Sequence, residues 1–238
     1  TPNGHQILID GGQEPYKARL YLGKKMPFWD YTLDMVVLTH SHEDHLGGLP
    51  QVLLKYKVDY ILDSHLSPGS YSYEKWQEQV KAEKAVDIRA QDGMIIDLGN
   101  NTLLEVLHPP EESKNTSAAD IDDNALALRL TVGNIRFLMP SDNRVKGQRE
   151  TLLNHPDLWS TVLAAPHHGG DSLDPLFIKA ASPSAVIVSA SFQDKPSQER
   201  TVSKLAERFP QSSILTTSQS GSIEFITDGE KLWMRTER

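Results

Sequence analysis

The stretch "VVLTHSHEDHLGGLP", residues 36–50, decides how the rest of the chain is interpreted. It places three histidines, a glutamate and an aspartate within the six positions from His40 to His45, between an apolar run and two glycines. Side chains this polar rarely serve core packing when they are crowded together. Imidazole and carboxylate groups at this density are typical of a site for Zn, Mn or Fe ions.

Two later segments end in the same residue types. "FLMPSD" closes an apolar run at Asp142, and "LAAPHH" closes another at His167 and His168. A second ion next to the first needs ligands from outside the first motif, and these strand ends are the candidates. The remaining histidines stand alone in the sequence and are interpreted as surface or core residues: His5, His65, His108 and His155.

The bulk composition excludes several classes of protein. The 238 residues contain no cysteine, which rules out disulfides, thiolate metal ligands and cysteine nucleophiles. No apolar run reaches the ~18 residues needed to span a bilayer, and the first residues do not resemble a signal peptide. The formal net charge of −8 argues against a general electrostatic grip on nucleic acid or anionic membrane, so any such contact must be local.

Apolar periodicity predicts alternating strands and helices without a linker between domains. We expect helices over 48–57, 74–84, 148–154 and 201–209, and polar loops over 13–34 and 113–123. Hairpins are predicted over 125–142 and 223–234. Polar clusters at strand ends are typical of α/β folds. The predicted strands cover residues 6–9, 35–39, 59–63, 94–99, 102–109, 160–170 and 185–190.

The motif His40-x-His42-x-Asp44-His45, with "DGG" upstream at Asp10, resembles the metallo-β-lactamase fold superfamily. That resemblance implies an α/β fold, a four-layer αββα sandwich, and two divalent ions, Zn or Mn. By this likeness His40 and His42 hold the first ion. The likeness assigns the remaining roles as follows: Asp44, His45 and His167 on the second ion, Asp142 between the ions, and Asp10 bracing the loop from behind.

A narrower likeness covers nearly the whole chain. "TPNGHQILIDGG", "LLEVLHPP", "DDNALALRL", "APHHGG" and "TTSQSGSIEFITDGEKLWM" resemble the C-terminal hydrolase domain of ComEC-type competence proteins. These are bacterial membrane proteins that import DNA during natural transformation. The resemblance implies a soluble domain, residues 1–238, excised from such a protein without its first strand. It also implies two partners, a DNA strand that the domain degrades and the channel portion of the parent protein, but not the side of the membrane that the domain faces.

Two departures from the family pattern matter. Many superfamily members place a histidine between Asp44 and Asp142 to complete the first ion's ligands, but no histidine of the matching segment fits and His108 precedes it as an outside candidate, so we expect that site to be weak or completed by water. The matching segment offers Asn124 instead, expected just behind the ligands. The family's His-Pro after "AVIVSA" is Lys195-Pro196 here, and Lys195 is a candidate phosphate contact. In the predicted phosphodiester hydrolysis, Asp44 orients or deprotonates water and His168 contacts the phosphate or leaving oxygen.

Alternatives remain open at this stage. A small-molecule phosphodiesterase or esterase of the same fold, such as a phosphorylcholine esterase or a lactonase relative, would show a narrow closed pocket. A non-catalytic module that binds metal or DNA would hold one ion or none. The lysines and aromatic residues from Tyr16 to Trp29 predict either a DNA track or a solvated loop. Which of His167 and His168 binds metal is not decided by the sequence.

Overall fold

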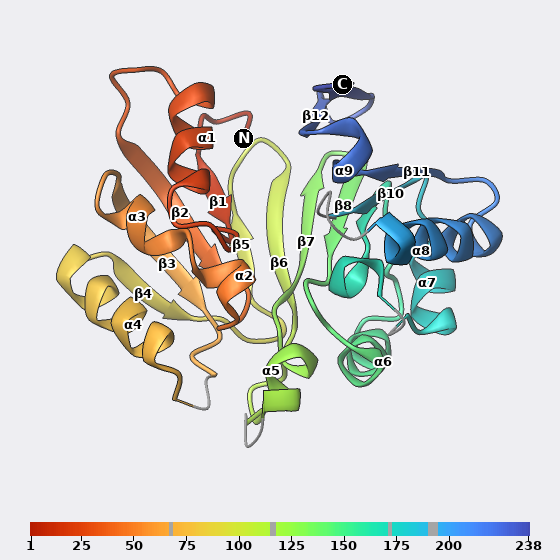
Figure 1. Cartoon of the computed structure of the whole chain (residues 1–238), viewed down its shortest axis with the longest axis horizontal. Helices are drawn as coiled ribbons and strands as arrows, with labels where there is room; N and C mark the ends of the chain where they lie inside the picture. Colours follow the sequence, from red (N-terminus) through yellow and green to blue (C-terminus); the bar gives the residue numbers. More distant parts are fainter. Residues whose placement is uncertain (67–68, 115–117, 171–172, 190–194) are drawn as a thin grey trace. The chain divides into compact units, whose positions relative to one another are not determined.

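A computed structural model of the chain describes residues 1–66, 69–114, 118–170, 173–189 and 195–238, without the side chains of 118–119, 195–199 and 201. The chain forms two compact units. Unit 1 comprises residues 1–92 and 109–126, and unit 2 comprises residues 93–108 and 127–238. Figure 1 follows the chain from the red N-terminal strand of unit 1 to the blue C-terminal hairpin of unit 2. Unit 1 is therefore discontinuous in sequence.

The sheet of unit 1 is entirely parallel. Its order is β1-β2-β3-β4, so the carboxyl ends of all four strands meet at one edge. Polar residues that follow these strands are thereby gathered at that edge. The strands are β1 (Ile7–Ile9), β2 (Thr32–Leu38), β3 (Lys57–Asp63) and β4 (Val86–Arg89).

Helices α1 (Lys17–Lys25), α3 (Leu49–Leu53) and α4 (Tyr71–Glu83) accompany this sheet (Figure 1). In α4 the buried residues Tyr73, Trp76 and Val80 recur at helical spacing and pack in one core with residues of β2 and β3. Ser70 caps α4, because its side chain accepts a hydrogen bond from the Tyr73 N–H. Two short helices complete unit 1: α2 (Glu43–Leu46) and α5 (Ala118–Asp123).

Two glycine pairs allow the backbones of the "DGG" and "LGG" segments to cross in contact. The Gly11 N–H donates to His45 O at 2.7 Å, and the Gly48 N–H donates to Gly12 O at 2.8 Å. A Cβ atom on Gly48 would lie 2.2 Å from the Gly11 carbonyl oxygen, and one on Gly11 would lie 2.5 Å from Leu49 N. Only glycine fits at these two positions. Their contact fixes residues 39–45, which we call the histidine-rich loop, against the end of β1.

The main sheet of unit 2 has seven strands in the order β11-β10-β9-β8-β7-β6-β5. The strands from β11 to β8 are parallel, and those from β8 to β5 are antiparallel. The strands are β5 (Ile95–Asp97), β6 (Thr102–His108), β7 (Ala127–Val132), β8 (Ile135–Met139), β9 (Val162–Ala164), β10 (Ala185–Val188) and β11 (Ser213–Thr216).

The core of unit 2 lies between this sheet and its helices. Phe177, Ile178 and Ala181 on α7 pack in one cluster with Leu163 of β9 and Val186 of β10. A C-terminal hairpin, β12 (Ile223–Thr227) and β13 (Leu232–Thr236), turns at Asp228-Gly229 as the sequence predicts. The helical segments are α6 (Val145–Asn154), the 3₁₀ turn η1 (Pro166–Gly169), α7 (Pro175–Ala181), α8 (Lys195–Arg208) and α9 (Thr217–Ser220).

The predicted strands and hairpins are confirmed, with β2 and β3 beginning earlier than expected and the other strands shorter, whereas both predicted loops are partly wrong. Residues 13–34 contain α1, whose spaced residues Ala18, Leu22 and Met26 pack against the core of unit 1. Residues 113–123 contain α5, an acidic helix without an apolar stripe to signal it. The strand expected over 160–170 ends at Ala164. In the described ranges, no helix has both the length and the apolar character required to cross a bilayer.

Candidate metal centre

The first cluster of possible metal ligands lies within unit 1 and consists of His40, His42 and Asp122. Asp122 Oδ1 lies 3.0 Å from His42 Nδ1 and 3.9 Å from His40 Nε2. Two ligand atoms that share one tetrahedral ion at roughly 2.0–2.2 Å lie about 3.3–3.6 Å apart. The two separations, 3.0 and 3.9 Å, lie on either side of that range. We call His40, His42 and Asp122 cluster A.

The chemistry of cluster A also fits a cation. His40 follows β2 at the carboxyl edge of the sheet, His42 precedes α2, and Asp122 lies near the end of α5. His40 and Asp122 are buried. A buried carboxylate is costly unless positive charge accompanies it. Two imidazoles and a carboxylate are a donor set that Zn and Mn accept, so cluster A can hold a divalent ion.

Asp122 is the residue that sequence reasoning missed. The sequence offers no fitting histidine as a third ligand, and it places Asn124 of the segment "DDNALAL" only behind the ligands. Asn124 is buried, and its side-chain Nδ2 donates to Lys114 O at 3.3 Å. Asp122, two residues earlier, lies beside His40 and His42 instead. Three acidic residues among positions 120–123 could have indicated a metal ligand, but this acidic run also fits a polar loop.

Asp10 holds the histidine-rich loop through three hydrogen bonds. Its Oδ1 accepts from the Thr39 N–H at 2.8 Å, and its Oδ2 accepts from the Thr39 hydroxyl at 2.8 Å. Asp10 Oδ2 also lies 2.7 Å from His45 Nδ1. A proton on Nδ1 in this pair leaves the lone pair on Nε2, the arrangement that carboxylate–histidine partners of metal sites provide.

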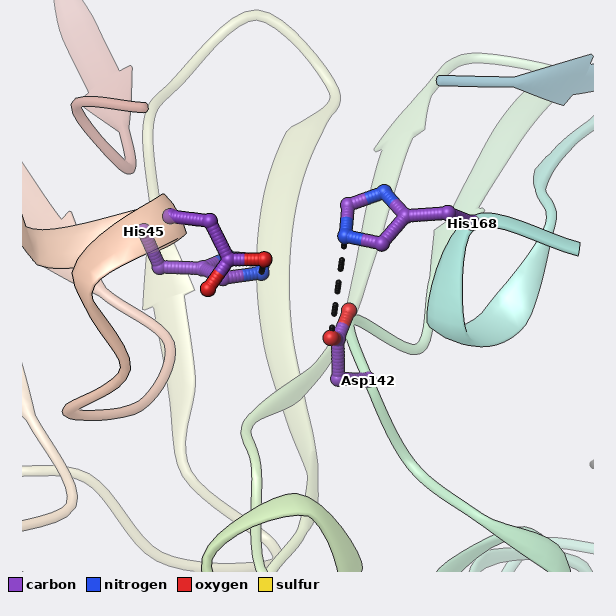
Figure 2. Close-up of side chains that lie close together, drawn as sticks. His45, Asp142 and His168 are labelled. Atoms are coloured by element: carbon purple, nitrogen blue, oxygen red, sulfur yellow. Dashed lines mark ion pairs between the residues drawn. The ribbon is translucent and has the colours of Figure 1, made fainter. Parts of the chain in front are cut away.

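Asp44 and His45 lie together on α2. Asp44 Oδ2 is 3.9 Å from His45 Nε2, the nitrogen that Asp10 does not contact. The imidazole of His45, which Figure 2 labels, is nearly buried, whereas the Asp44 carboxylate is half-exposed. Next to them, Glu43 accepts a hydrogen bond from Ser72 and so connects α2 to α4. Asp44 and His45 thus offer unit 1 a second pair of donor atoms beyond cluster A.

The second cluster lies within unit 2 and consists of Asp142, His167 and His168; we call it cluster B. Asp142 Oδ2 lies 3.7 Å from His168 Nε2, the ion pair drawn in Figure 2. The same oxygen lies 3.8 Å from His167 Nε2. Asp142 is buried, and both imidazoles are partly exposed. Either histidine can therefore share an ion with Asp142, and the distances do not separate them.

The backbone of cluster B is left-handed at three non-glycine residues. Ser141 has a φ of 50°, His167 of 48° and His168 of 54°. Such residues are uncommon and costly, and they persist only where surrounding structure imposes them. Here the His167 N–H donates to Ser141 O at 3.0 Å and ties η1 to the end of β8. Both imidazoles are presented by this strained turn.

A buried polar network supports the Asp142 loop from behind. Asn143 O accepts from Gln148 Nε2 at 2.6 Å, and Gln148 Oε1 accepts from the Asp174 N–H at 2.8 Å. The Asp174 carboxylate caps α7 and pairs with Arg149 Nε at 2.7 Å. Burial raises the pKa of Asp174, but the hydrogen bonds from Arg149 and the α7 backbone outweigh it and lower the pKa.

Another buried carboxylate, Asp63, lies at the end of β3 on the same sheet edge as His40. It accepts hydrogen bonds from the His65 N–H at 3.0 Å and the Tyr73 hydroxyl at 2.9 Å. Burial raises the pKa of Asp63, and these hydrogen bonds offset only part of that effect. Asp63 joins β3 to α4 and belongs to neither cluster.

The other predicted residues are placed as follows. Lys195, the candidate phosphate contact, is the first residue of α8, and its side chain lies outside the described residues. His5 Nδ1 pairs with Asp34 at 2.9 Å, and His65 Nε2 pairs with Asp87 at 2.8 Å. His108 is buried at the end of β6.

Comparison with known proteins identifies the class. The model of the metallo-beta-lactamase superfamily matches residues 1–121, which include Asp10 and the whole histidine-rich loop. The chain belongs to the metallo-beta-lactamase superfamily. Among curated proteins it is similar to ComE operon protein 3 of Bacillus subtilis (strain 168), with 25% identity over 242 residues. That match covers 92% of this chain and 30% of the relative, so the chain spans about a third of that protein's length.

A shorter similarity links the chain to a phage protein. Anti-Pycsar protein Apyc1 of Bacillus phage 010DV004 is 32% identical over 83 residues, which cover 33% of this chain and 30% of the relative. The similarity to ComE operon protein 3 agrees with the resemblance to ComEC-type proteins that the sequence motifs indicate.

Solved structures agree on the fold. The CmlA beta-hydroxylase aligns with a TM-score of 0.53 at 11% identity, covering 81% of this chain and 44% of that chain. A protein from Parabacteroides distasonis described as a metal-dependent hydrolase aligns with a TM-score of 0.50 at 13% identity, covering 90% and 85%. At such identities the likeness concerns the fold alone. The predicted metallo-β-lactamase fold is confirmed.

Proposed function

We propose that this chain is a phosphodiesterase that cleaves DNA with the help of two divalent ions, Zn or Mn. The observation that carries the proposal is the presence of two buried carboxylates, Asp122 and Asp142, each beside two imidazoles. DNA as substrate rests on the sequence resemblance to ComEC-type competence proteins, and the similarity to ComE operon protein 3 supports it. In that setting the natural partner is the membrane channel portion of a larger parent protein.

The proposed ligands follow the two clusters. His40, His42 and Asp122 would hold the first ion. By the superfamily resemblance, Asp44, His45 and His167 would hold the second ion and Asp142 would serve both. When bound, such ions polarise phosphoryl oxygens and lower the pKa of water. These are the needs of phosphodiester hydrolysis, in which negative charge accumulates on the phosphoryl group.

Two side chains are suited to proton transfer. The half-exposed Asp44 carboxylate orients a water molecule and accepts its proton. The imidazole of His168, exposed on the η1 turn, donates a proton to the leaving oxygen of the scissile phosphate. Asp10 contributes indirectly, because it holds His45 and Thr39 in fixed orientations.

The test is hydrolysis of end-labelled single- and double-stranded DNA with Mn, Zn or EDTA. We expect cleavage with metal, none with EDTA, and loss of cleavage in Asp44→Ala and Asp142→Ala. Asp59→Ala is the matched control, because Asp59 is as exposed as Asp44 (51% against 48%) but is not among the proposed ligands or proton-transfer residues. Cleavage that persists in EDTA or in Asp142→Ala would overturn the proposal.

The roles of the two adjacent histidines require a separate experiment. We expect His167→Ala to lower the number of bound ions measured by elemental analysis. His168→Ala should keep both ions and lower turnover by about 10²–10⁴-fold, the usual worth of a general acid. The reverse result would exchange the two assignments.

A further inference from the structure

One surface of unit 1 carries several aromatic side chains that are exposed to solvent instead of packed in the core. Phe28 is 81% exposed and Trp29 is 70% exposed, and their rings touch edge to face at 4.7 Å. Tyr16, Tyr21 and Tyr31 are also exposed. All five aromatic residues belong to α1 or its flanks, at the red end of the chain in Figure 1. We call residues 16–31 with Lys55 the aromatic surface.

The inner face of α1 accounts for its attachment to unit 1. Ala18, Leu22 and Met26, four residues apart, pack against the core. Leu20 and Tyr21 point away and stay exposed, although burial of such side chains is favourable by about 1.5–3 kcal/mol each. Contiguous exposed aromatic area on a folded domain marks an interaction site.

Cations are interleaved with these rings. Arg19 Cζ lies 5.1 Å from the Tyr16 centroid, and Lys25 Nζ lies 5.7 Å from the Tyr21 centroid. Lys55 Nζ lies 5.4 Å from both the Tyr31 and Tyr56 centroids. A ring attracts a cation without neutralising its charge, so each pair keeps its positive charge.

The charge of this segment opposes that of the whole chain. Residues 16–31 contain four basic residues, Lys17, Arg19, Lys24 and Lys25, and one acidic residue, Asp30. Hydrogen bonds from Thr32 and Gln6 lower the pKa of Asp30, which keeps its charge, and Lys17 pairs with Glu14 at 3.0 Å. Arg19, Lys24 and Lys25 therefore supply the excess positive charge of this segment. The chain as a whole carries −8. A local positive surface on an acidic chain is complementary to a polyanion.

We propose that the aromatic surface binds single-stranded DNA, with bases stacked on Trp29 and Phe28 and phosphates held by the lysines and Arg19. Stacking platforms alternating with cations are the arrangement by which proteins hold single strands without sequence preference. The inference deepens the proposed function, on which it rests for the choice of DNA as the polyanion. It places substrate binding on α1 and its flanks, outside clusters A and B.

Binding is measured in EDTA, which prevents cleavage, by fluorescence anisotropy of a labelled oligothymidylate with the full 238-residue chain. We expect the double variant Phe28→Ala/Trp29→Ala to bind about 10–100-fold more weakly, since each stacked base contributes substantially. Lys24→Glu/Lys25→Glu should flatten the dependence of log affinity on log salt by roughly 1.4, or 0.7 for each lost phosphate contact. Circular dichroism verifies that each variant is folded.

The matched control is Trp233→Ala/Met234→Ala on β13, an exposed pair (49% and 45%) in unit 2 that should not change binding. Variants of the aromatic surface should keep hydrolysis of a small diester, bis(p-nitrophenyl) phosphate. Equal oligonucleotide affinity in wild type and both surface variants overturns the inference, as does a preference for anionic lipid vesicles over DNA. Binding that depends on the aromatic surface, without cleavage under any metal, overturns the proposed function and leaves this inference standing.

Discussion

Clusters A and B each combine one aspartate with two histidines, but the backbone positions these side chains differently in the two clusters. In cluster A, His40 and Asp122 are buried and come from segments more than 80 residues apart, brought together by a parallel sheet edge and α5. In cluster B, His167 and His168 are adjacent in sequence, partly exposed, and carried on a left-handed turn beside Asp142. Cluster A depends on long-range folding and cluster B on local strain.

The two clusters differ in how a lost ligand affects the side chains that remain. In cluster A the His40 imidazole is buried and the His42 imidazole is partly exposed, so removing the Asp122 carboxylate leaves one buried imidazole without it. Both imidazoles of cluster B are partly exposed to solvent. Because Asp122 supplies a third donor that the sequence did not reveal, we expect cluster A to hold its ion more tightly than the weak first site expected from the sequence.

The largest effect should come from Asp122→Ala, which removes the only carboxylate that cluster A contains. We expect metal affinity at this site to fall by more than about 100-fold, beyond the cost of losing an outer partner. Isothermal titration with Zn or Mn measures the number of sites and their affinities. Asp123→Ala, the neighbouring carboxylate outside the cluster, should bind both ions as wild type does. Unchanged binding in Asp122→Ala would end the assignment of this residue.

Gly48→Ala should destabilise the contact that holds the loop carrying His40 and His42 in place. The added Cβ meets the Gly11 carbonyl oxygen at 2.2 Å, and we expect a loss of about 3 kcal/mol in the free energy of unfolding. Gly12→Ala is the comparison, because Gly12 has a φ of 71° but open space around its Cβ position. That variant should lose only about 1–2 kcal/mol. Equal losses in urea denaturation would show that steric contact is not what fixes the loop.

Asp10→Asn should weaken metal binding by about 10–100-fold, as expected when the outer partner of a ligating histidine is changed. Its amide cannot accept from both Thr39 and His45 as the carboxylate does. Asp34→Asn alters a similar carboxylate–histidine pair with His5 at the surface and should leave metal affinity unchanged. A metal titration that gives the same affinity for both variants would contradict the bracing role of Asp10.

The smallest effect concerns the support of cluster B. Asp174→Ala removes the cap of α7 and the pair with Arg149, and should lower stability at pH 7 by about 1–2 kcal/mol. Because the folded state lowers the pKa of Asp174, its contribution is present above the unfolded value and is lost as pH falls through the folded value. Wild type and variant should therefore converge in acid. Asp174→Asn keeps the cap, so it should lose less, and a pH-independent difference would exclude the charge as the cause.

The sequence predicted most of the fold because strands of this chain are short apolar runs with turn residues at their ends. It missed α1 because three small or apolar residues, Ala18, Leu22 and Met26, are separated by charged and aromatic ones. The exposed apolar residues between them hide the helical period. Helix α5 was missed because it is too acidic to show an apolar stripe.

The histidine-rich loop could be recognised from the sequence, because ligands that are close in sequence form a motif. Asp122 did not, because its role depends on a contact with His42 that only the folded chain creates. The third ligand of the first ion also need not be a histidine, because carboxylates bind the same ions. The left-handed backbone conformation of His167 and His168 likewise cannot be predicted from two adjacent histidines in the sequence.

The discontinuity of unit 1 sets the order in which cluster A can be assembled during synthesis. A nascent chain that ends at Asp92 already holds all four strands of the parallel sheet, with His40 and His42 at its edge. Asp122 leaves the ribosome only after β5 and β6, which belong to unit 2. The donor set of cluster A is thus complete only after the first segment of unit 2, residues 93–108, has been synthesised.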